Sequence, residues 1–316
     1  MGYRIEKNET VEQAIRRVTC EQIDKAWTEL TDASLDRHEA VHQARKRFKK
    51  IRAVLRLARG SLDEVYALEN VWFRDIARTL ARVRDAGALI ETVDGIRQTF
   101  AEQIEPDAFA EVREALVRRR GELAKESGDL SERTADVAAQ LRAIRGRVER
   151  WRLSAGGFDA LEPGLRRTYR RGRKALGAAY EELTPEAFHE WRKRVKYHWY
   201  HVRLLREVWP GVMKARRRGV KDLADRLGDS HDLAVLQRTL RESSEEFGDT
   251  REVQALLGLV RRRQTELRAE ARPLGRRIFA EKPKALSKRI ARYWRAWADE
   301  PAPVLAVDAG EEATCC

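Results

Sequence analysis

The chain has 316 residues, of which 42% are hydrophobic and 36% are charged, a length that suits two ordinary domains or one large two-lobed domain. Lys and Arg number 64 against 51 Asp and Glu, which gives a net charge of +13 and a pI near 9.9. No stretch approaches about 18 uncharged apolar residues, which excludes a membrane-spanning helix, and the basic excess favours a polyanionic partner such as nucleic acid, an acidic membrane surface or a phosphate polymer.

Apolar residues recur with a period close to 3.6 residues through almost the whole chain, which predicts an all-α fold. In the first half we expect helices near residues 9–32, 37–60, 64–84, 86–103, 106–126 and 131–153. The glycine pair at 156–157 marks a seam between two halves. In the second half we expect helices near residues 159–182, 185–209, 212–229, 231–246, 249–271 and 284–298.

Individual residues predict where several helices begin and what packs between them. Asp36 is suited to starting a helix, and Pro185 after Thr184 is the pattern of an N-cap followed by proline at the first helical position. Pro273 is expected to follow the end of a helix. The large aromatic residues expected in the core are Trp72, Phe73, Trp191, Trp209 and Trp294.

The three cysteines indicate a reducing compartment. Cys20 lies inside a predicted helix, Cys315 and Cys316 close the chain, and no spacing fits a set of zinc ligands. The N-terminal sequence MGYRIEKNET has no apolar run, so we expect no secretory signal. We therefore predict a cytoplasmic protein without a cofactor or a bound metal.

One basic motif occurs twice, 147 residues apart. Residues 40–59 read AVHQARKRFKKIRAVLRLAR and residues 187–206 read AFHEWRKRVKYHWYHVRLLR, and nine of the twenty positions are identical without a gap. One identity is the pair His42 and His189, and six others are cationic. The cationic pairs are Arg45/Arg192, Lys46/Lys193, Arg47/Arg194, Lys49/Lys196, Arg56/Arg203 and Arg59/Arg206.

A second motif repeats at the same offset. Residues 74–89, RDIARTLARVRDAGAL, align with residues 221–236, KDLADRLGDSHDLAVL. Two motifs in one order at one spacing indicate a duplicated unit of roughly 150 residues. Within the second motif, Arg84-Asp85 aligns with His231-Asp232 at a predicted helix junction. A carboxylate at such a junction can cap the next helix or orient a nearby arginine.

Each copy of the basic motif forms a cationic stripe on one face of its predicted helix. At about 100° per residue, the cations of each copy fall on one side, within about 80° of arc in the first copy. The residues that gather on the other side are Val41, Phe48, Ile51, Leu55 and Ala58 in the first copy and Trp191, Val195, His198 and Val202 in the second. Like charges on one helix face repel each other by about 0.2–0.5 kcal/mol per pair, so two such stripes indicate an anion site rather than an ordinary solvated face. The first stripe is His42, Arg45, Lys49, Arg52 and Arg56, and the second stripe is His189, Arg192, Lys196 and Arg203, with Trp199 in the place of Arg52.

These motifs resemble those of the CHAD family, which is named for a histidine-bearing α-helical domain. The likeness rests on VHQARKRFKKIRAVLRL and FHEWRKRVKYHWYHVRLL, each followed by its second motif, and on RRTYRRGRKAL at 166–176 and ARPLGRRIFAEKPKAL at 271–286. The resemblance implies two similar helical bundles related by pseudo-twofold symmetry, about residues 9–153 and 159–298, which enclose a basic central channel. We expect this domain to span residues 1–298 and the acidic tail 299–316 to be disordered.

The resemblance also implies a function, because CHAD domains bind inorganic polyphosphate in this channel and associate with polyphosphate granules. Carried over by position, the nine stripe residues are the binding candidates. A second tier of candidates comprises Lys46, Arg74, Arg84, Lys193, Lys221 and His231. The chain departs from the family pattern at Trp199, which replaces a cation, and at Gly87 and Ala234, which stand where the family often has an acid.

Two other functions are open at this point. Nucleic-acid binding is compatible with the net charge, although the basic faces carry no aromatic residue except Trp199 and Tyr200. A metal-dependent phosphohydrolase is suggested by His231-Asp232, but most of the six histidines lie within or beside cationic stripes that repel a divalent metal. We therefore predict a non-catalytic protein whose partner is inorganic polyphosphate, with non-specific nucleic acid as the alternative and no membrane insertion. The sequence identifies no protein partner.

Overall fold

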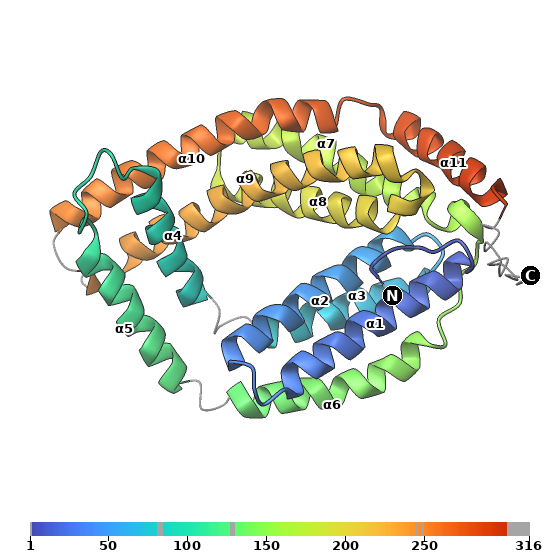
Figure 1. Cartoon of the computed structure of the whole chain (residues 1–316), viewed down its shortest axis with the longest axis horizontal. Helices are drawn as coiled ribbons and strands as arrows, with labels where there is room; N and C mark the ends of the chain where they lie inside the picture. The colour runs from blue at the N-terminus through green and yellow to red at the C-terminus, as the bar shows by residue number, and fades with distance from the viewer. Residues whose placement is uncertain (1, 81–84, 127–129, 244–245, 248–249, 302–316) are drawn as a thin grey trace, which may run out of the picture.

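The described part of the chain is almost entirely helical. The computed structural model describes residues 2–80, 85–126, 130–243, 246–247 and 250–301. Within these ranges it contains eleven α-helices, two short 3-10 helices and no strand, so the predicted all-α fold is confirmed (Figure 1). The helices are α1 (Val11–Thr31), α2 (Arg37–Leu57), α3 (Asp63–Thr79), α4 (Asp85–Thr99), α5 (Ala110–Glu126), α6 (Leu130–Val148), η2 (Gly157–Ala160), α7 (Glu162–Glu182), α8 (Pro185–Leu204), η3 (Arg206–Val208), α9 (Pro210–Glu242), α10 (Thr250–Ile278) and α11 (Pro283–Asp299).

Four helices of the first half, α1, α2, α3 and α6, form one bundle (Figure 1). The local sequence explains where two of them begin. Thr10 and Gln13 form a capping box at the start of α1. Asp36 caps α2, as predicted, because its carboxylate accepts hydrogen bonds from the backbone N–H groups of His38 and Glu39. The apolar faces of these helices meet in the larger of two hydrophobic cores.

The helices of the second half pack as a second bundle, in which α8 lies against both α7 and α9. The predicted cap of α8 is confirmed, since the hydroxyl of Thr184 accepts from the N–H of Ala187 at 3.2 Å and Pro185 opens the helix. Helix α10 packs along α9, and α11 packs on α7. Because α2 contacts both α7 and α8, the larger core continues from the first bundle into the second.

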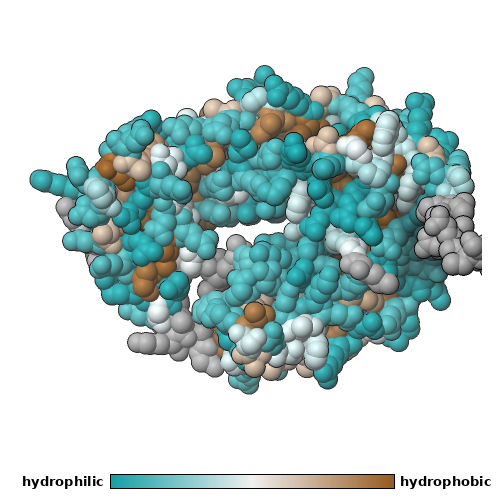
Figure 2. All heavy atoms as spheres, viewed as in Figure 1, coloured by the Kyte–Doolittle hydropathy of each residue, from teal (hydrophilic) through white to brown (hydrophobic). Residues whose placement is uncertain are grey.

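Helix α4 lies outside the first bundle and packs against α5, α9 and α10 (Figure 1). This end of the molecule has its own hydrophobic core, in which Val93, Leu116, Leu236 and Val260 are buried. The two cores therefore lie toward opposite ends of the molecule. Figure 2 shows an elongated opening between them, bordered by hydrophilic residues.

A predicted helix boundary in the second half is wrong. Helix α9 runs unbroken from Pro210 to Glu242, so His231 and Asp232 lie inside a helix rather than at a junction between helices ending at 229 and starting at 231. Ser230 is buried, and its carbonyl accepts a hydrogen bond from Gln264 of α10 at 3.0 Å. Such packing outweighs the roughly 1 kcal/mol by which a helical glycine such as Gly228 disfavours the helix.

Two smaller expectations also fail. Pro273 lies inside α10, which continues to Ile278. The turn after the proline packs closely against α8, since a Cβ atom at Gly275 would lie 2.5 Å from the ring of Trp191. Of the aromatic residues expected in the core, Trp209 is 49% exposed and makes an edge contact with the ring of Tyr293. The others are buried or partly buried in the larger core.

Several predictions stay open. At the 147-residue offset α2 falls on α8 and α1 on α7, but the duplication itself remains a prediction. Arg84 and most of the acidic tail, residues 302–316, lie outside the described residues. Among the helices that the structure describes, none combines the length and the apolarity needed to cross a lipid bilayer.

Candidate anion-binding site

The first stripe lies on the face of α2 that points away from the larger core. The residues predicted to form the opposite, apolar face are all buried, namely Val41, Phe48, Ile51, Leu55 and Ala58. Four of the stripe residues are half-buried and Lys49 is exposed. Burial of the apolar face fixes the rotation of the helix about its axis, and the cations are thereby held together on the other side.

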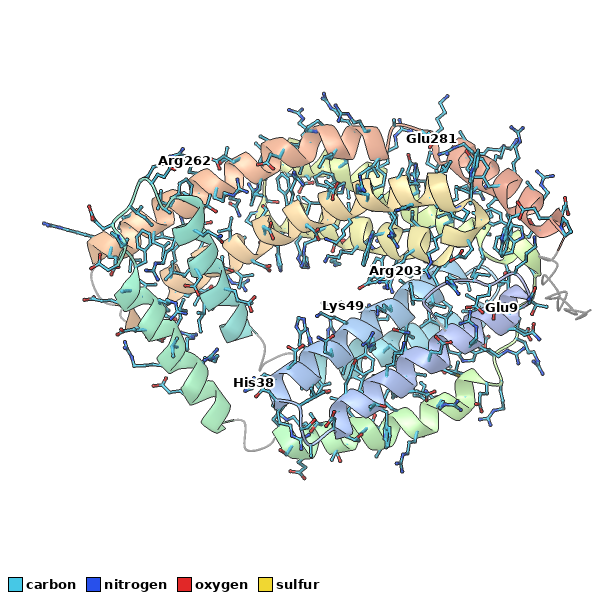
Figure 3. The ribbon with its side chains drawn as sticks, viewed as in Figure 1. Glu9, His38, Lys49, Arg203, Arg262 and Glu281 are labelled. Atoms are coloured by element: carbon cyan, nitrogen blue, oxygen red, sulfur yellow. The ribbon has the colours of Figure 1, made fainter. Side chains whose placement is uncertain are left out.

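The second stripe lies on α8, and burial of the apolar face again fixes the rotation of the helix. Its predicted apolar face, which includes Trp191 and Val195, is buried, and all four stripe residues are half-buried. Figure 3 shows Lys49 on the edge of α2 that borders the opening, and Arg203 where α2 and α8 come together. The two stripes therefore approach the same opening from two helices of different bundles.

Helix α3 orients the end of the first stripe through Asn70. Its side-chain oxygen accepts a hydrogen bond from Arg56 at 2.6 Å and a longer one from Arg52 at 3.4 Å. Arg56 also donates to the carbonyl of Arg52 at 3.0 Å, and Arg45 donates to the carbonyl of Ala77. A neutral amide can position two guanidinium groups without neutralising their charge.

Aromatic rings orient the end of the second stripe. The guanidinium of Arg203 lies 5.4 Å from the ring centroid of Trp199 and 5.5 Å from that of Tyr3. Trp199, which replaces a cation of the first stripe, therefore supports its neighbour by a cation–π contact. Within the described residues, Arg52, Arg56 and Arg203 form no ion pair with a carboxylate, so their charges are available to an external anion.

His189, which starts the second stripe on α8, is paired with His231 of α9. Nδ1 of His189 lies 3.3 Å from Nδ1 of His231 on α9, which requires that at least one of the rings is neutral. Burial lowers the pKa of His189, with Lys193 and Arg192 adding to the effect. Burial also lowers the pKa of His231 to about 3.

Cations of both stripes act on His231. After burial, the cations that lower the pKa of His231 include Arg192 on α8 and Lys49 on α2. Burial likewise lowers the pKa of Lys196, and the charge of Arg192 lowers it further. A positive field of this kind, built from two bundles, attracts an anion into the space between them.

The second-tier candidates are placed differently from the stripes. Arg74 pairs with Asp75 at 2.8 Å, Lys193 pairs with Glu190, and Lys221 pairs with Asp225. These cations are neutralised by carboxylates on their own helices and contribute less to an anion site. His231 belongs to the histidine pair, Lys46 is half-buried on α2, and Arg84 lies outside the described residues.

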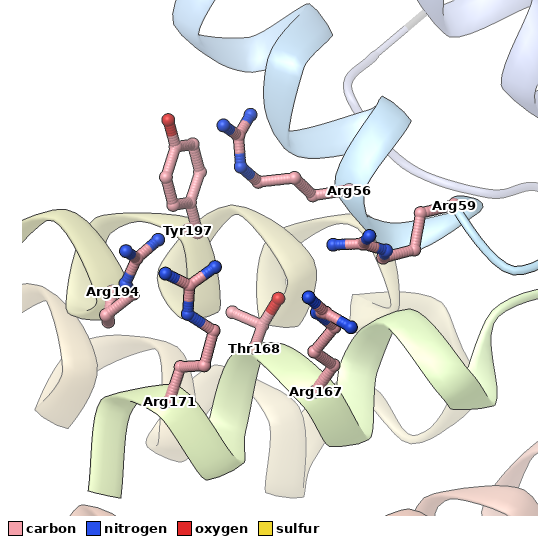
Figure 4. Close-up of a pocket in the computed structure, with 7 residues that line it drawn as sticks. All are labelled: Arg56, Arg59, Arg167, Thr168, Arg171, Arg194 and Tyr197. Carbon is pink, nitrogen blue, oxygen red and sulfur yellow. The ribbon is translucent and has the colours of Figure 1, made fainter. Parts of the chain in front are cut away.

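A pocket at the end of the first stripe contains cations that the sequence analysis missed (Figure 4). Of its lining residues only Arg56 was among the predicted binding residues. A signal for Arg167 and Arg171 was present, because the segment RRTYRRGRK at 166–174 spaces arginines at four-residue intervals along one helix face. Arg59 and Arg194 belong to the cationic pairs of the repeated motif. The pocket is lined by Arg56, Arg59, Arg167, Thr168, Arg171, Arg194 and Tyr197.

The described residues do not form a metal centre. Among them, no group of three or more His, Cys, Asp or Glu side chains is placed to hold a metal ion. The pair His189 and His231 therefore lacks a third ligand of these types within the part of the chain that the structure covers. The site offers cations and N–H donors, which is the chemistry of anion binding.

The comparison with known proteins identifies the family of the chain. No curated protein matches the chain. The family model of the CHAD domain matches residues 17–241, which is more than two thirds of the 316 residues and includes both stripes and both copies of the second motif. The chain thus belongs to the CHAD domain family.

Proposed function

We propose that the protein binds inorganic polyphosphate, without catalysis, by holding the polymer between the first and the second stripe. One observation carries this proposal: two rows of Arg, Lys and His on helices of different bundles approach one opening. Arg52, Arg56 and Arg203 in these rows have no carboxylate partner among the described residues. Membership of the CHAD family supports the same ligand, because its motifs imply polyphosphate binding.

The geometry of the stripes suits a linear polyanion. A helix rises about 1.5 Å per residue, so the line from His42 to Arg56 offers about 21 Å of contact. Polyphosphate carries about one negative charge per internal phosphate and has no base edge or apolar group to recognise. Recognition by charge density alone needs multidentate donors, which arginine supplies, and compact charges, which lysine supplies. We further propose that the protein acts in the cytoplasm and associates there with polyphosphate granules.

The test is a titration with long-chain polyphosphate at near-physiological salt. We expect the Arg45→Glu/Arg192→Glu variant to lose most of the affinity, because it places two negative charges inside the stripes. The single variant Lys49→Glu changes an exposed residue and leaves the core intact. As a control, Arg276→Glu/Arg292→Glu makes the same change of net charge on exposed positions of α10 and α11, at the outer edge of the molecule (Figure 1).

The outcomes separate the competing functions. Equal loss in the stripe and the control variants would mean that net charge alone drives binding, as for non-specific nucleic acid. Duplex DNA that displaces polyphosphate at equal phosphate concentration would support the nucleic-acid alternative. Release of orthophosphate from polyphosphate with Mg²⁺ or Mn²⁺ would contradict a non-catalytic role.

A further inference from the structure

Helices α2, α7 and α8 enclose a pocket whose charged lining residues are all arginines (Figure 4). We call it the arginine pocket. Arg167 and Arg171 stand one turn apart on α7, and Arg194 comes from α8. Arg56 lies in the last turn of α2, and Arg59 follows two residues after the helix. Three helices from both halves of the chain therefore point guanidinium groups at one small volume.

A glycine contact makes this convergence possible. At Gly164, near the start of α7, a Cβ atom would lie 1.9 Å from the carbonyl oxygen of Leu57 and 2.4 Å from that of Arg56. No other residue fits without displacing backbone. The close approach of α7 to the end of α2 brings Arg59 beside Arg167 and Arg171 (Figure 4).

The positive charges in the pocket are mostly uncompensated. Arg194 pairs with Glu190 at 2.8 Å, but no other ion pair to a pocket arginine exists in the described residues. The guanidinium of Arg56 lies over the ring of Tyr197 at 4.1 Å, and that of Arg59 lies over the ring of Tyr66 at 4.4 Å. These rings position the cations without neutralising them.

Repulsion and burial both act on these arginines. Burial lowers the pKa of Arg56, Arg59 and Arg171, and the charges of neighbouring pocket arginines lower it further. Arginine stays protonated in proteins, so the folded chain carries this unfavourable energy. A bound anion relieves it, because each guanidinium offers several donors that match phosphate oxygens.

The size of the pocket limits the ligand. Its cavity volume is about 20 Å³. This is far below the roughly 300–1,000 Å³ of sites that enclose drug-sized molecules, so a single phosphoryl group fits better than a nucleotide. Arg56 belongs both to the pocket and to the first stripe, so a polymer in contact with the stripe can end in the pocket.

We propose that the arginine pocket binds the terminal phosphoryl group of a linear oligo- or polyphosphate. A terminal phosphoryl group presents three acceptor oxygens and a charge of about −1.5 to −2 near pH 7, more than an internal phosphate does. A cluster of five arginines therefore selects chain ends over internal units. This inference rests on the proposed function, because it assigns the stripes to internal phosphates and the pocket to ends.

The experiment compares two small probes, linear tripolyphosphate and cyclic trimetaphosphate, which has no chain end. The pocket variant is Arg167→Gln/Arg171→Gln. The matched control is Arg166→Gln/Arg173→Gln, which removes two exposed arginines that do not line the pocket from the same helix. Circular dichroism establishes that both variants are folded.

We expect wild type and control to bind tripolyphosphate tighter than trimetaphosphate, and the pocket variant to lose about tenfold or more of the tripolyphosphate affinity. Long-chain polyphosphate should keep most of its affinity for the pocket variant. Equal binding of the two probes, or no loss in the pocket variant, would overturn the inference. Orthophosphate binding as tightly as tripolyphosphate would also overturn it, by assigning the pocket to the free ion.

The same titrations distinguish this inference from the proposed function. If tripolyphosphate binds through the pocket while long-chain polyphosphate does not depend on the stripes, the proposed function fails and the pocket is a separate anion site. If long chains depend on the stripes and the pocket variant has no effect, the proposed function stands and the inference fails.

Discussion

His201 on α8 is held neutral at the contact between α8 and α2. Its Nε2 lies 3.0 Å from the carbonyl oxygen of Ala53, and because a carbonyl only accepts, Nε2 carries the proton. The side chain is fully buried. Burial lowers the pKa of His201 from its usual 6.5 to about 3, and the charge of Arg56 adds to the effect of burial.

This depressed pKa makes the free energy of unfolding depend on pH. As pH falls below about 6.5, the unfolded chain takes up a proton at His201 before the folded chain does, so the stabilisation is complete above that pH and is lost below it. A pH of 5 lies about 1.5 units below the usual pKa of histidine, and each unit changes the free energy of unfolding by about 1.36 kcal/mol. His201 alone should therefore reduce the free energy of unfolding by about 2 kcal/mol between pH 7 and pH 5.

Urea unfolding of wild type and His201→Gln at both pH values measures this contribution. Glutamine keeps an N–H donor for the carbonyl of Ala53 but does not titrate, and the carboxylates contribute equally to both proteins. Between pH 7 and pH 5 we expect the free energy of unfolding to fall by about 2 kcal/mol less in the variant than in wild type. Equal losses in the two proteins would refute the argument that burial keeps His201 neutral.

Three further predictions follow from burial, packing and charge. Gly164→Ala should lower the free energy of unfolding by about 1–3 kcal/mol or more, because the new Cβ atom would overlap the carbonyl oxygen of Leu57. The control is Gly258→Ala, whose Cβ atom would meet no neighbour within 4 Å, and equal melting temperatures of the two variants would contradict the contact at Gly164. Burial raises the pKa of Cys20 to about 11, so iodoacetamide at about pH 8 should leave it unmodified in peptide mass spectrometry of the native protein. Polyphosphate affinity should fall between about 50 and 200 mM salt, and a salt-independent affinity would argue against the stripes.

Local sequence predicted the helices and the two stripes because both depend on neighbours along the chain. The apolar face of α2, with Phe48 and Ile51, was predicted from periodicity alone and is buried. The caps Asp36 and Thr184 were predicted for the same reason, since a cap acts within four residues.

The predicted helix boundaries were wrong where contacts between distant residues override the local preference of the chain. Glycine and proline in a sequence suggest a break, but in α9 and α10 they lie inside continuous helices. Gln264 holds the backbone at Ser230, and Gly275 packs on Trp191, and neither contact is visible from the flanking residues. The absence of Trp209 from the core has a similar cause, since its exposure depends on how α9 starts beside α11.

The sequence by itself determined that the chain is helical and that two of its helices each carry cations on one face and apolar residues on the other. Only the tertiary structure decided that these two faces border one opening, that α4 packs on α9 and α10, and that Arg59, Arg167, Arg171 and Arg194 converge with Arg56. The physical reason is that periodicity reports the environment of each helix separately. Which faces meet is fixed by long-range packing, such as the contact of Gly164 with the end of α2.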